Sequence, residues 1–183
     1  MFSLALIAAL AAAALTMLVA GGASAANLRT TGFLVPVGTT LHATQESGSV
    51  ITSTTDGSTI VSTCTISTIL ATVSSTGGST VTANIDKVVS QGCTVLTQIL
   101  VLGTLHIDAA GTVTGSGTTY TVNTGVSCRY GYGSGTHLGT LNTGKLAMNA
   151  VIVEQEPKQF LCPDTTKWVA NYVFTSPHDL TAA

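Results

Sequence analysis

The sequence has very little charge. Only six basic and eight acidic side chains occur in 183 residues, with a formal net charge of −2. No basic cluster is present, so the chain lacks the electrostatic signature of a nucleic-acid-binding protein, and we expect no nucleic acid partner. A surface that is poor in like charges repels copies of itself only weakly, which favours self-association.

Motifs for metal ions, cofactors and common catalytic sites are missing as well. There is no Cys-x-x-Cys or His-x-x-x-His spacing for zinc. The glycine loop over residues 131–135 carries its serine one place away from that of a nucleophile elbow. The stretch 139–145 lacks the spacing of a phosphate loop. We therefore predict no metal, no cofactor and no enzyme activity.

A small set of polar residues carries the alternative hypothesis of an enzyme. His106 and Asp108 share one face of a predicted strand, because side chains alternate along strands. Together with His137 and Ser134 they would form a metal site or part of a catalytic triad if the fold brought them together. No spacing links these residues, so the favoured interpretation is a solvent-facing polar pair beside a loop histidine.

Two carboxylates near the end of the chain are a second, weaker alternative. Glu154 and Glu156 share a strand face, and the functional alternative is a pair of acids in a hydrolase. They adjoin Pro157 and Lys158 in what the sequence predicts to be an exposed turn. We therefore expect both carboxylates to be solvated charges.

Long apolar runs are missing after the N-terminal region, so we expect no later membrane-spanning helix. Leu4 to Ala20 is apolar, and residues 23–25 form the small-x-small pattern of a cleavage site. We predict a secretory signal peptide over residues 1–25 and one domain over residues 26–183, secreted or located at the cell surface. The alternative is an uncleaved N-terminal anchor.

The four cysteines are most simply two disulfides in a secreted chain. Sequence alone allows three pairings. We favour Cys64 with Cys93 and Cys128 with Cys162. Each bridge would close a loop of about 30 residues and contribute ~3–4 kcal/mol in the chain-entropy model.

What the chain does contain is Thr, Val, Gly, Ser and Ile, a composition typical of strands joined by glycine turns. Turn signals every eight to twelve residues divide the mature chain into about ten short strands and indicate an antiparallel sandwich or barrel. We predict an all-β fold, an antiparallel β-sandwich with two disulfides. Trp168, Tyr172 and Phe174 should lie in its core, and Val95 to Leu102 should be a strand buried on both faces.

Binding and assembly predictions rest on particular segments. Tyr130 and Tyr132 flank a glycine loop and are candidates for an exposed sugar- or lipid-binding platform. Residues 26–31 are predicted to be a flexible lead-in, and residues 176–183 a weakly structured tail. We predict that a charge-poor edge over residues 112–119 accepts the lead-in from a neighbouring copy.

The order of cysteines and strand motifs resembles a known group of proteins. It consists of an early Cys64, Thr80–Ile85 running to Gly92-Cys93-Thr94, Gly111–Gly115, Gly125–Tyr130, Cys162 and finally Trp168–Tyr172. This order resembles secreted bacterial, actinobacterial-type Thr/Gly-rich β-sandwich proteins, and is distantly similar to alkane-oxidation activator proteins of the cell surface and biofilm matrix. The resemblance implies secretion, the fold and disulfides, and it transfers no active site. The chain lacks the tryptophan often found after the second cysteine in that group.

These observations favour a secreted, non-enzymatic protein of the envelope or extracellular matrix with a structural or self-associating surface role. The alternative is a carrier or adhesin for an apolar or carbohydrate ligand. An apolar cavity above ~300 Å³ would favour the carrier.

Overall fold

The computed structural model describes residues 25–46, 48 and 50–183, so residues 1–24 of the predicted signal peptide lie outside the described residues. The described chain forms sixteen strands and no helix, and every pairing is antiparallel. The strands are β1 Leu28–Thr30, β2 Phe33–Leu34, β3 Thr40–Gln45, β4 Val50–Thr54, β5 Ile60–Cys64, β6 Ile66–Ser75, β7 Thr80–Gln91, β8 Leu96–Val101, β9 Thr104–Asp108, β10 Thr112–Ser116, β11 Thr119–Asn123, β12 Ser127–Gly131, β13 Thr136–Asn142, β14 Lys145–Glu154, β15 Thr165–Ser176 and β16 Thr181–Ala182.

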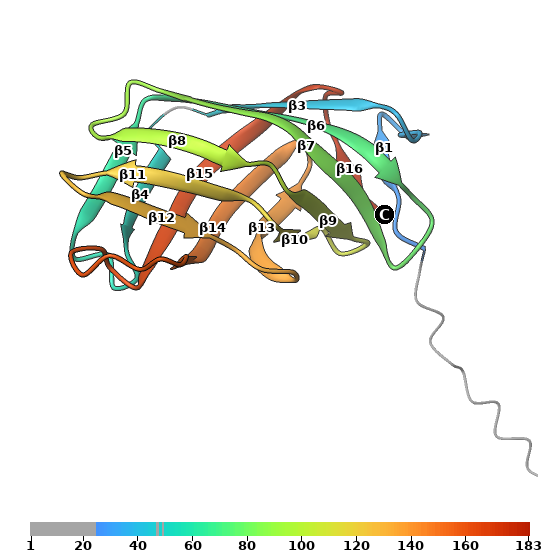
Figure 1. Ribbon diagram of the computed structural model, residues 1–183. Coiled ribbons are helices and arrows are strands. Elements are labelled where there is room, and N and C mark those ends of the chain that lie inside the picture. The colour runs from blue at the N-terminus through green and yellow to red at the C-terminus, as the bar shows by residue number, and fades with distance from the viewer. Residues whose placement is uncertain (1–24, 47, 49) are drawn as a thin grey trace, which may run out of the picture.

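Eight of these strands close into a barrel, in the order β15-β3-β6-β7-β9-β10-β13-β14, and the pairing of β14 with β15 closes the ring (Figure 1). The predicted all-β, antiparallel class is correct, but the predicted sandwich of about ten strands is wrong. A sandwich requires two sheets with separate edges. Here β14 and β15 each have partners on both sides, so the hydrogen-bonded ladder continues around the ring.

A second lobe is built on β14 and β15, the two strands that close the barrel. β15 pairs with β3 through residues 172–176 and with β4 through residues 166–169. The end of β14 pairs with β12, which continues to β11 and β8. The second lobe therefore consists of β5-β4-β15-β14-β12-β11-β8, and it shares β14 and β15 with the barrel.

Strict alternation in the sequence explains why β14 and β15 form the shared wall. Along β14, exposed and buried residues alternate at every position, with Leu146, Met148, Ala150 and Ile152 buried. In β15, Trp168, Ala170, Tyr172 and Phe174 are buried, as the alternation of side chains predicts. The predicted core position of the aromatic strand is correct.

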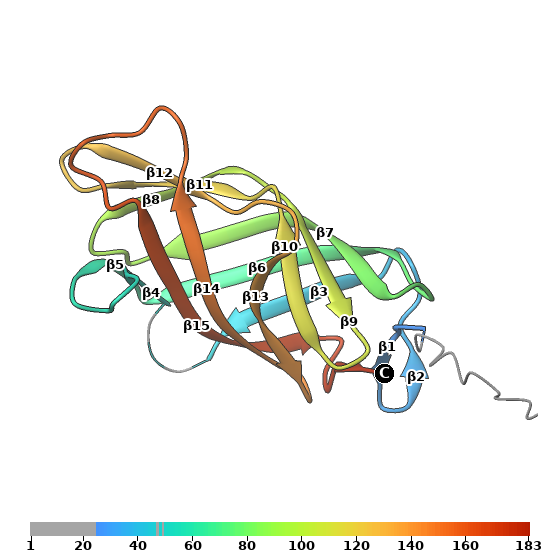
Figure 2. The same ribbon diagram turned by 90° about the horizontal axis from the view of Figure 1, so that it is seen from below.

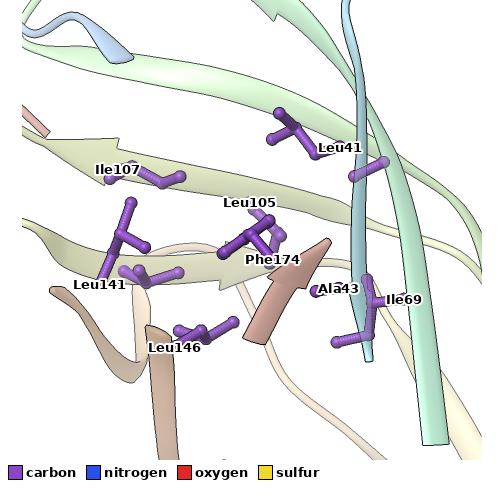
Figure 3. Close-up of a pocket in the computed structure, with 10 residues that line it drawn as sticks. Leu41, Ala43, Ile69, Leu105, Ile107, Leu141, Leu146 and Phe174 are labelled. Carbon is purple, nitrogen blue, oxygen red and sulfur yellow. The ribbon is translucent and has the colours of Figure 1, made fainter. Parts of the chain in front are cut away.

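The barrel interior is aliphatic. Its wall residues, which Figure 3 shows gathered around one space, are Leu41, Ala43, Ile69, Ala71, Leu105, Ile107, Val113, Leu141, Leu146 and Phe174. The cavity left between them measures only about 10 Å³. The interior is therefore close-packed core, as in most protein interiors.

Both ends of the described chain are part of the fold. β1 pairs with β16 and β2, and Ala26, Leu28 and Leu180 are completely buried. The predicted flexible lead-in and weakly structured tail are therefore wrong. Isolated apolar residues in polar surroundings, Leu28 and Leu180, anchor these two short strands to the core.

Two predictions about edges are also corrected. The proposed acceptor edge begins with β10, which pairs with β9 on one side and β13 on the other, and continues into β11, which lies between β8 and β12. β8, predicted to be buried on both faces, is instead the terminal strand of the sheet. Leu96, Leu100, Val101 and Leu102 are exposed there.

The four cysteines form the two favoured bridges, Cys64–Cys93 and Cys128–Cys162. The first joins β5 to the β7–β8 turn. The second joins β12 to the loop between β14 and β15. Disulfides of this kind fit an oxidising environment.

Candidate binding surfaces

His106 is the first residue of the predicted catalytic set, and each nitrogen of its imidazole ring lies close to a threonine hydroxyl. Nδ1 lies 3.2 Å from Oγ1 of Thr82, and Nε2 lies 3.1 Å from Oγ1 of Thr104. Thr82 and His106 are cross-strand partners of β7 and β9. His106 therefore has a hydroxyl partner at each ring nitrogen, as expected of a structural histidine on a sheet face.

The other members of the predicted constellation lie apart. His106 and His137 both face Thr114 from opposite sides, so two strand spacings, roughly 9–10 Å, separate them. The carboxylate of Asp108 accepts the backbone N–H groups of Ala110 and Thr112 and closes the β9–β10 turn. Ser134 is exposed in the loop before β13. The fold thus does not assemble these residues into a triad.

The expectation that Glu154 is solvated is wrong. Its side chain is only 5% exposed because β14 continues to this residue. Oε1 accepts the backbone N–H of Gln159 at 2.8 Å. Glu156 is exposed, as predicted. The two carboxylates therefore occupy different environments, and Glu154 organises the loop that follows it.

Tyr130 and Tyr132 do not form an exposed platform. Tyr130 is fully buried and Tyr132 is 8% exposed. In β12, alternation turns Cys128 and Tyr130 inward. The hydroxyl of Tyr132 donates to Oγ1 of Thr118 at 2.8 Å. Sequence reasoning placed these rings at the surface because a glycine loop follows them, but the strand before that loop determines their direction.

Tyr120, the centre of the aromatic cluster inside the second lobe, was not among the core residues predicted from the sequence. Its ring centroid lies 5.3 Å from that of Trp168, edge to face, and 5.8 Å from that of Tyr130. Its hydroxyl lies 3.2 Å from Oγ1 of Thr166. The alternation of Tyr120 and Val122 between exposed or half-buried residues in β11 was the available signal.

Burial raises the pKa of every tyrosine in this cluster, because removal from water disfavours the phenolate. The pKa of Tyr130 and that of Tyr172 rise to about 12, and that of Tyr120 rises further. Near Tyr130 the Glu154 carboxylate adds to the effect. Hydrogen bonds, such as the 2.9 Å contact of Tyr172 with Ser67, oppose it only in part. These tyrosines are therefore neutral structural groups at physiological pH.

Interior space is small in both lobes. The larger enclosed cavity, about 30 Å³, lies among residues that include Met148, Trp168 and Tyr132. Sites for small molecules typically measure ~300–1,000 Å³. The candidate binding features must therefore be sought at the surface.

One exposed apolar cluster, here called the hairpin pole, lies at the β1–β2 hairpin and the segment after it. Phe33 is 75% exposed, Leu34 56% and Val37 57%. These three residues fall within five positions of one another. A cluster of large apolar side chains in water is more informative than single exposed residues, because clusters mark contact sites.

The second cluster, here called the loop pole, is formed by Phe160 and Leu161 between β14 and β15. Phe160 is fully exposed, and Leu161 is 70% exposed. Both views of the fold place this loop at the opposite end of the molecule from β1 and β2 (Figures 1 and 2). The long axis of the protein therefore carries an apolar cluster at each end.

Several interactions hold the loop pole in place. The neighbouring Cys162 is bonded to Cys128, and Nζ of Lys158 lies 3.0 Å from Oδ1 of Asp164. This contact raises the pKa of Lys158. The backbone N–H of Glu154 donates to the carbonyl of Asp164 at the base of the loop. The exposed Phe160 is thus presented by a braced loop.

Further features bear on membranes, metals and relatives. Among the described residues, no helix has the length and apolar character needed to cross a membrane, and no three His, Cys, Asp or Glu side chains cluster as metal ligands.

Comparison with protein-family models, curated proteins and solved structures gives no match. The resemblance to secreted Thr/Gly-rich proteins stays a prediction.

Proposed function

We propose that this chain is a secreted, non-enzymatic structural protein of the cell envelope or extracellular matrix that assembles end to end. The observation that carries this proposal is the pair of exposed apolar clusters at opposite ends of the molecule, the hairpin pole and the loop pole. Secretion is supported by the predicted signal peptide and by the two disulfides.

The assembly contact joins unlike surfaces. Phe160 and Leu161 of one copy pack against Phe33 and Leu34 of the next, removing apolar surface from water at about 25 cal/mol per Å². Unlike ends at opposite poles give a head-to-tail contact, and such contacts generate open chains of subunits unless a rotation closes them into a ring. The low charge of the protein keeps repulsion between copies small.

Complementary variants test this arrangement. F160S removes the ring from the loop pole, and F33S removes the ring from the hairpin pole. Each variant alone should sediment as a monomer at concentrations where the unmodified mature protein forms larger species. A mixture of the two should form heterodimers, because each retains the one pole that the other lacks. The matched control is V151T, which changes an exposed apolar residue of β14 outside both poles.

Two results would overturn the proposal. One is a mature protein that stays monomeric at millimolar concentration. The other is a V151T variant whose association is lost as completely as that of F160S, which would place the contact on the strand faces.

An adhesin is the second candidate, favoured by the complete exposure of Phe160 on a braced loop. It predicts a monomer that adsorbs to octyl-agarose through this loop, with F160S eluting earlier and F33S unchanged. The carrier alternative gains no support from the enclosed cavities of about 10 and 30 Å³.

A further inference from the structure

Two strand edges face each other across a gap between β7 and β8. The second half of β7, from Asp86 to Gln91, pairs with β6 on one side, whereas its pairing with β9 stops at Asn84. β8 pairs with β11 on one side and is the last strand of its sheet. Alternate backbone N–H and C=O groups of both edges therefore point towards the gap.

The gap is closed at its two ends, so it forms a window. At one end the backbone N–H of Ile85 donates to the carbonyl of Gly103 at 2.9 Å. At the other end the turn after Gln91 is held to β5 by the Cys64–Cys93 bridge. There the backbone N–H of Thr94 also donates to the carbonyl of Thr63. The chain is therefore fixed on both sides of the opening.

The window is an open groove of about 520 Å³, within the usual size range of ligand sites. Its lining residues are Val88, Val89, Ser90, Gln91, Thr97, Gln98, Ile99 and Leu100. Two of them, Val88 and Ile99, also line the enclosed cavity beside Trp168, so they separate the groove from that cavity in the core. The groove thus has backbone edges as its walls and aliphatic side chains at its base.

None of the residues that line the groove is charged, and the two charged residues of the β7 edge, Asp86 and Lys87, lie outside this lining. A charged ligand entering this groove would lose water without gaining an opposite charge, which is costly. An extended peptide with uncharged side chains avoids that cost and can satisfy the backbone groups of the two edges. The lining also lacks an aromatic ring on which a sugar would stack.

We propose that this window binds a single extended, uncharged segment of another polypeptide by strand addition. The segment lies along β8, hydrogen-bonds to its unpaired edge, and directs alternate apolar side chains towards Val88 and Ile99. Strand addition to an exposed sheet edge is a general mode of peptide recognition. The proposal concerns a surface separate from both poles and does not rest on end-to-end assembly.

The closed ends select the occupant. A second folded copy would bring its own β8 together with the attached β11, whereas an extended segment brings only one strand to an opening that the Ile85–Gly103 contact and the β7–β8 turn close at its two ends. The ends of the described chain are also occupied, since Asn27 exchanges backbone hydrogen bonds with Ala183. We therefore take the occupant to be a flexible segment of a partner protein.

The probe is a capped, fluorescein-labelled peptide of alternating Thr and Val, six residues long, with binding followed by fluorescence anisotropy. Two control peptides separate the mechanisms. One carries Glu in place of each Val, and the other carries N-methyl groups at alternate residues, which remove the backbone donors on one side of the strand. We expect each control to bind at least tenfold more weakly than the probe.

The matched protein variants are L100K and L96K. Both place a charge at an exposed leucine of β8, but only Leu100 lines the window. L100K should weaken peptide binding at least tenfold, and L96K should leave it within about twofold. F160S should also bind the peptide normally, which keeps this result independent of the assembly test.

Hydrogen exchange supplies the second measurement. Bound peptide should slow amide exchange in residues 86–91 and 96–101 together, because both edges face the occupant. Equal binding of the N-methylated peptide, or equal weakening by L96K and L100K, would overturn strand addition. Slowed exchange in these residues on concentrating the protein alone would show that a second copy occupies the window, and would also overturn the proposal.

Discussion

The barrel and the second lobe share β14 and β15, yet their interiors differ in chemistry. The barrel encloses mostly aliphatic side chains, with Tyr172 and Phe174 of β15 as aromatic exceptions, in a ring whose every strand has two neighbours. The second lobe encloses Tyr120, Tyr130 and Trp168 together with buried Thr and Ser hydroxyls. In the second lobe, β5 contacts Thr94 in the turn before β8, which brings the two end strands of the sheet together. The wall of this lobe remains open at the window between β7 and β8.

This difference shows two ways of specifying a β core. An aliphatic interior depends on volume and close packing, and it tolerates substitutions that conserve size. An interior with hydroxyls also depends on the orientation of its polar side chains, because each buried polar group costs free energy unless it has a hydrogen-bond partner. The second lobe should therefore be the more sensitive of the two regions to pH and to removal of single hydroxyls.

The largest expected effect that separates the two regions is alkaline unfolding. Buried Tyr120, Tyr130 and Tyr172 have raised pKa values, whereas in the unfolded chain they titrate near 10. The stability that neutral tyrosines contribute is complete below pH 10 and is lost as the pH rises towards 12. For each tyrosine that stays neutral in the fold, the loss is about 1.4 kcal/mol per pH unit.

Absorbance at 295 nm and circular dichroism, followed together against pH, test this expectation. Tyrosinate should appear only as the β-sheet signal is lost. Ionisation of three or four tyrosines near pH 10 in a protein that keeps its native spectrum would show that the second-lobe interior is open to water.

The next effect concerns the aromatic cluster. W168A removes the ring in contact with Tyr120 and should lower the free energy of unfolding by ~3–5 kcal/mol, the usual cost of emptying a large aromatic site. F160A, which removes an exposed ring of the loop pole, should change it by less than ~0.5 kcal/mol. Urea unfolding followed by circular dichroism measures both, since Trp168 is the only tryptophan. Equal effects would contradict the assignment of one ring to the core and the other to the surface.

The smallest effect tests the same dependence on hydroxyl partners inside the barrel wall, where Ser67 of β6 meets Tyr172 of β15. S67A removes the hydroxyl that lies 2.9 Å from the Tyr172 hydroxyl, and should cost ~1–3 kcal/mol because the tyrosine keeps a buried hydroxyl without this partner. The double variant S67A/Y172F removes both partners and should be more stable than S67A. Chemical unfolding of the two single variants and the double variant forms the cycle. A double variant less stable than S67A would show that packing outweighs the hydrogen bond.

Local patterns made parts of this structure predictable. The inward direction of Trp168, Tyr172 and Phe174 follows from strict alternation in one strand. The favoured cysteine pairing, one of three that the sequence allows, is the one that the structure forms. The orientation of Tyr130 was missed because a neighbouring glycine loop suggested exposure, although the strand pattern around Cys128 turned the ring inward.

Long-range pairing accounts for what the sequence did not predict. β8 lies in a largely apolar stretch, and such stretches are usually buried on both faces. It is exposed here because β11 is its one strand partner, and the turn after Gln91 is tied to β5. The two poles likewise become opposite ends only when β1 joins β16 far from the β14–β15 loop.

The sequence by itself determined the all-β class, the antiparallel strands, the inward face of the aromatic strand and the cysteines available for bridging, because side-chain alternation and turn chemistry act over a few residues. Only the tertiary structure decided that the sheet closes into a barrel, that Tyr120, Tyr130 and Trp168 meet in one cluster, and that a window separates β7 from β8. Closure depends on which of many similar Thr- and Val-rich strands become neighbours. That choice is set by the summed packing of side chains from distant segments, which no short stretch of sequence contains.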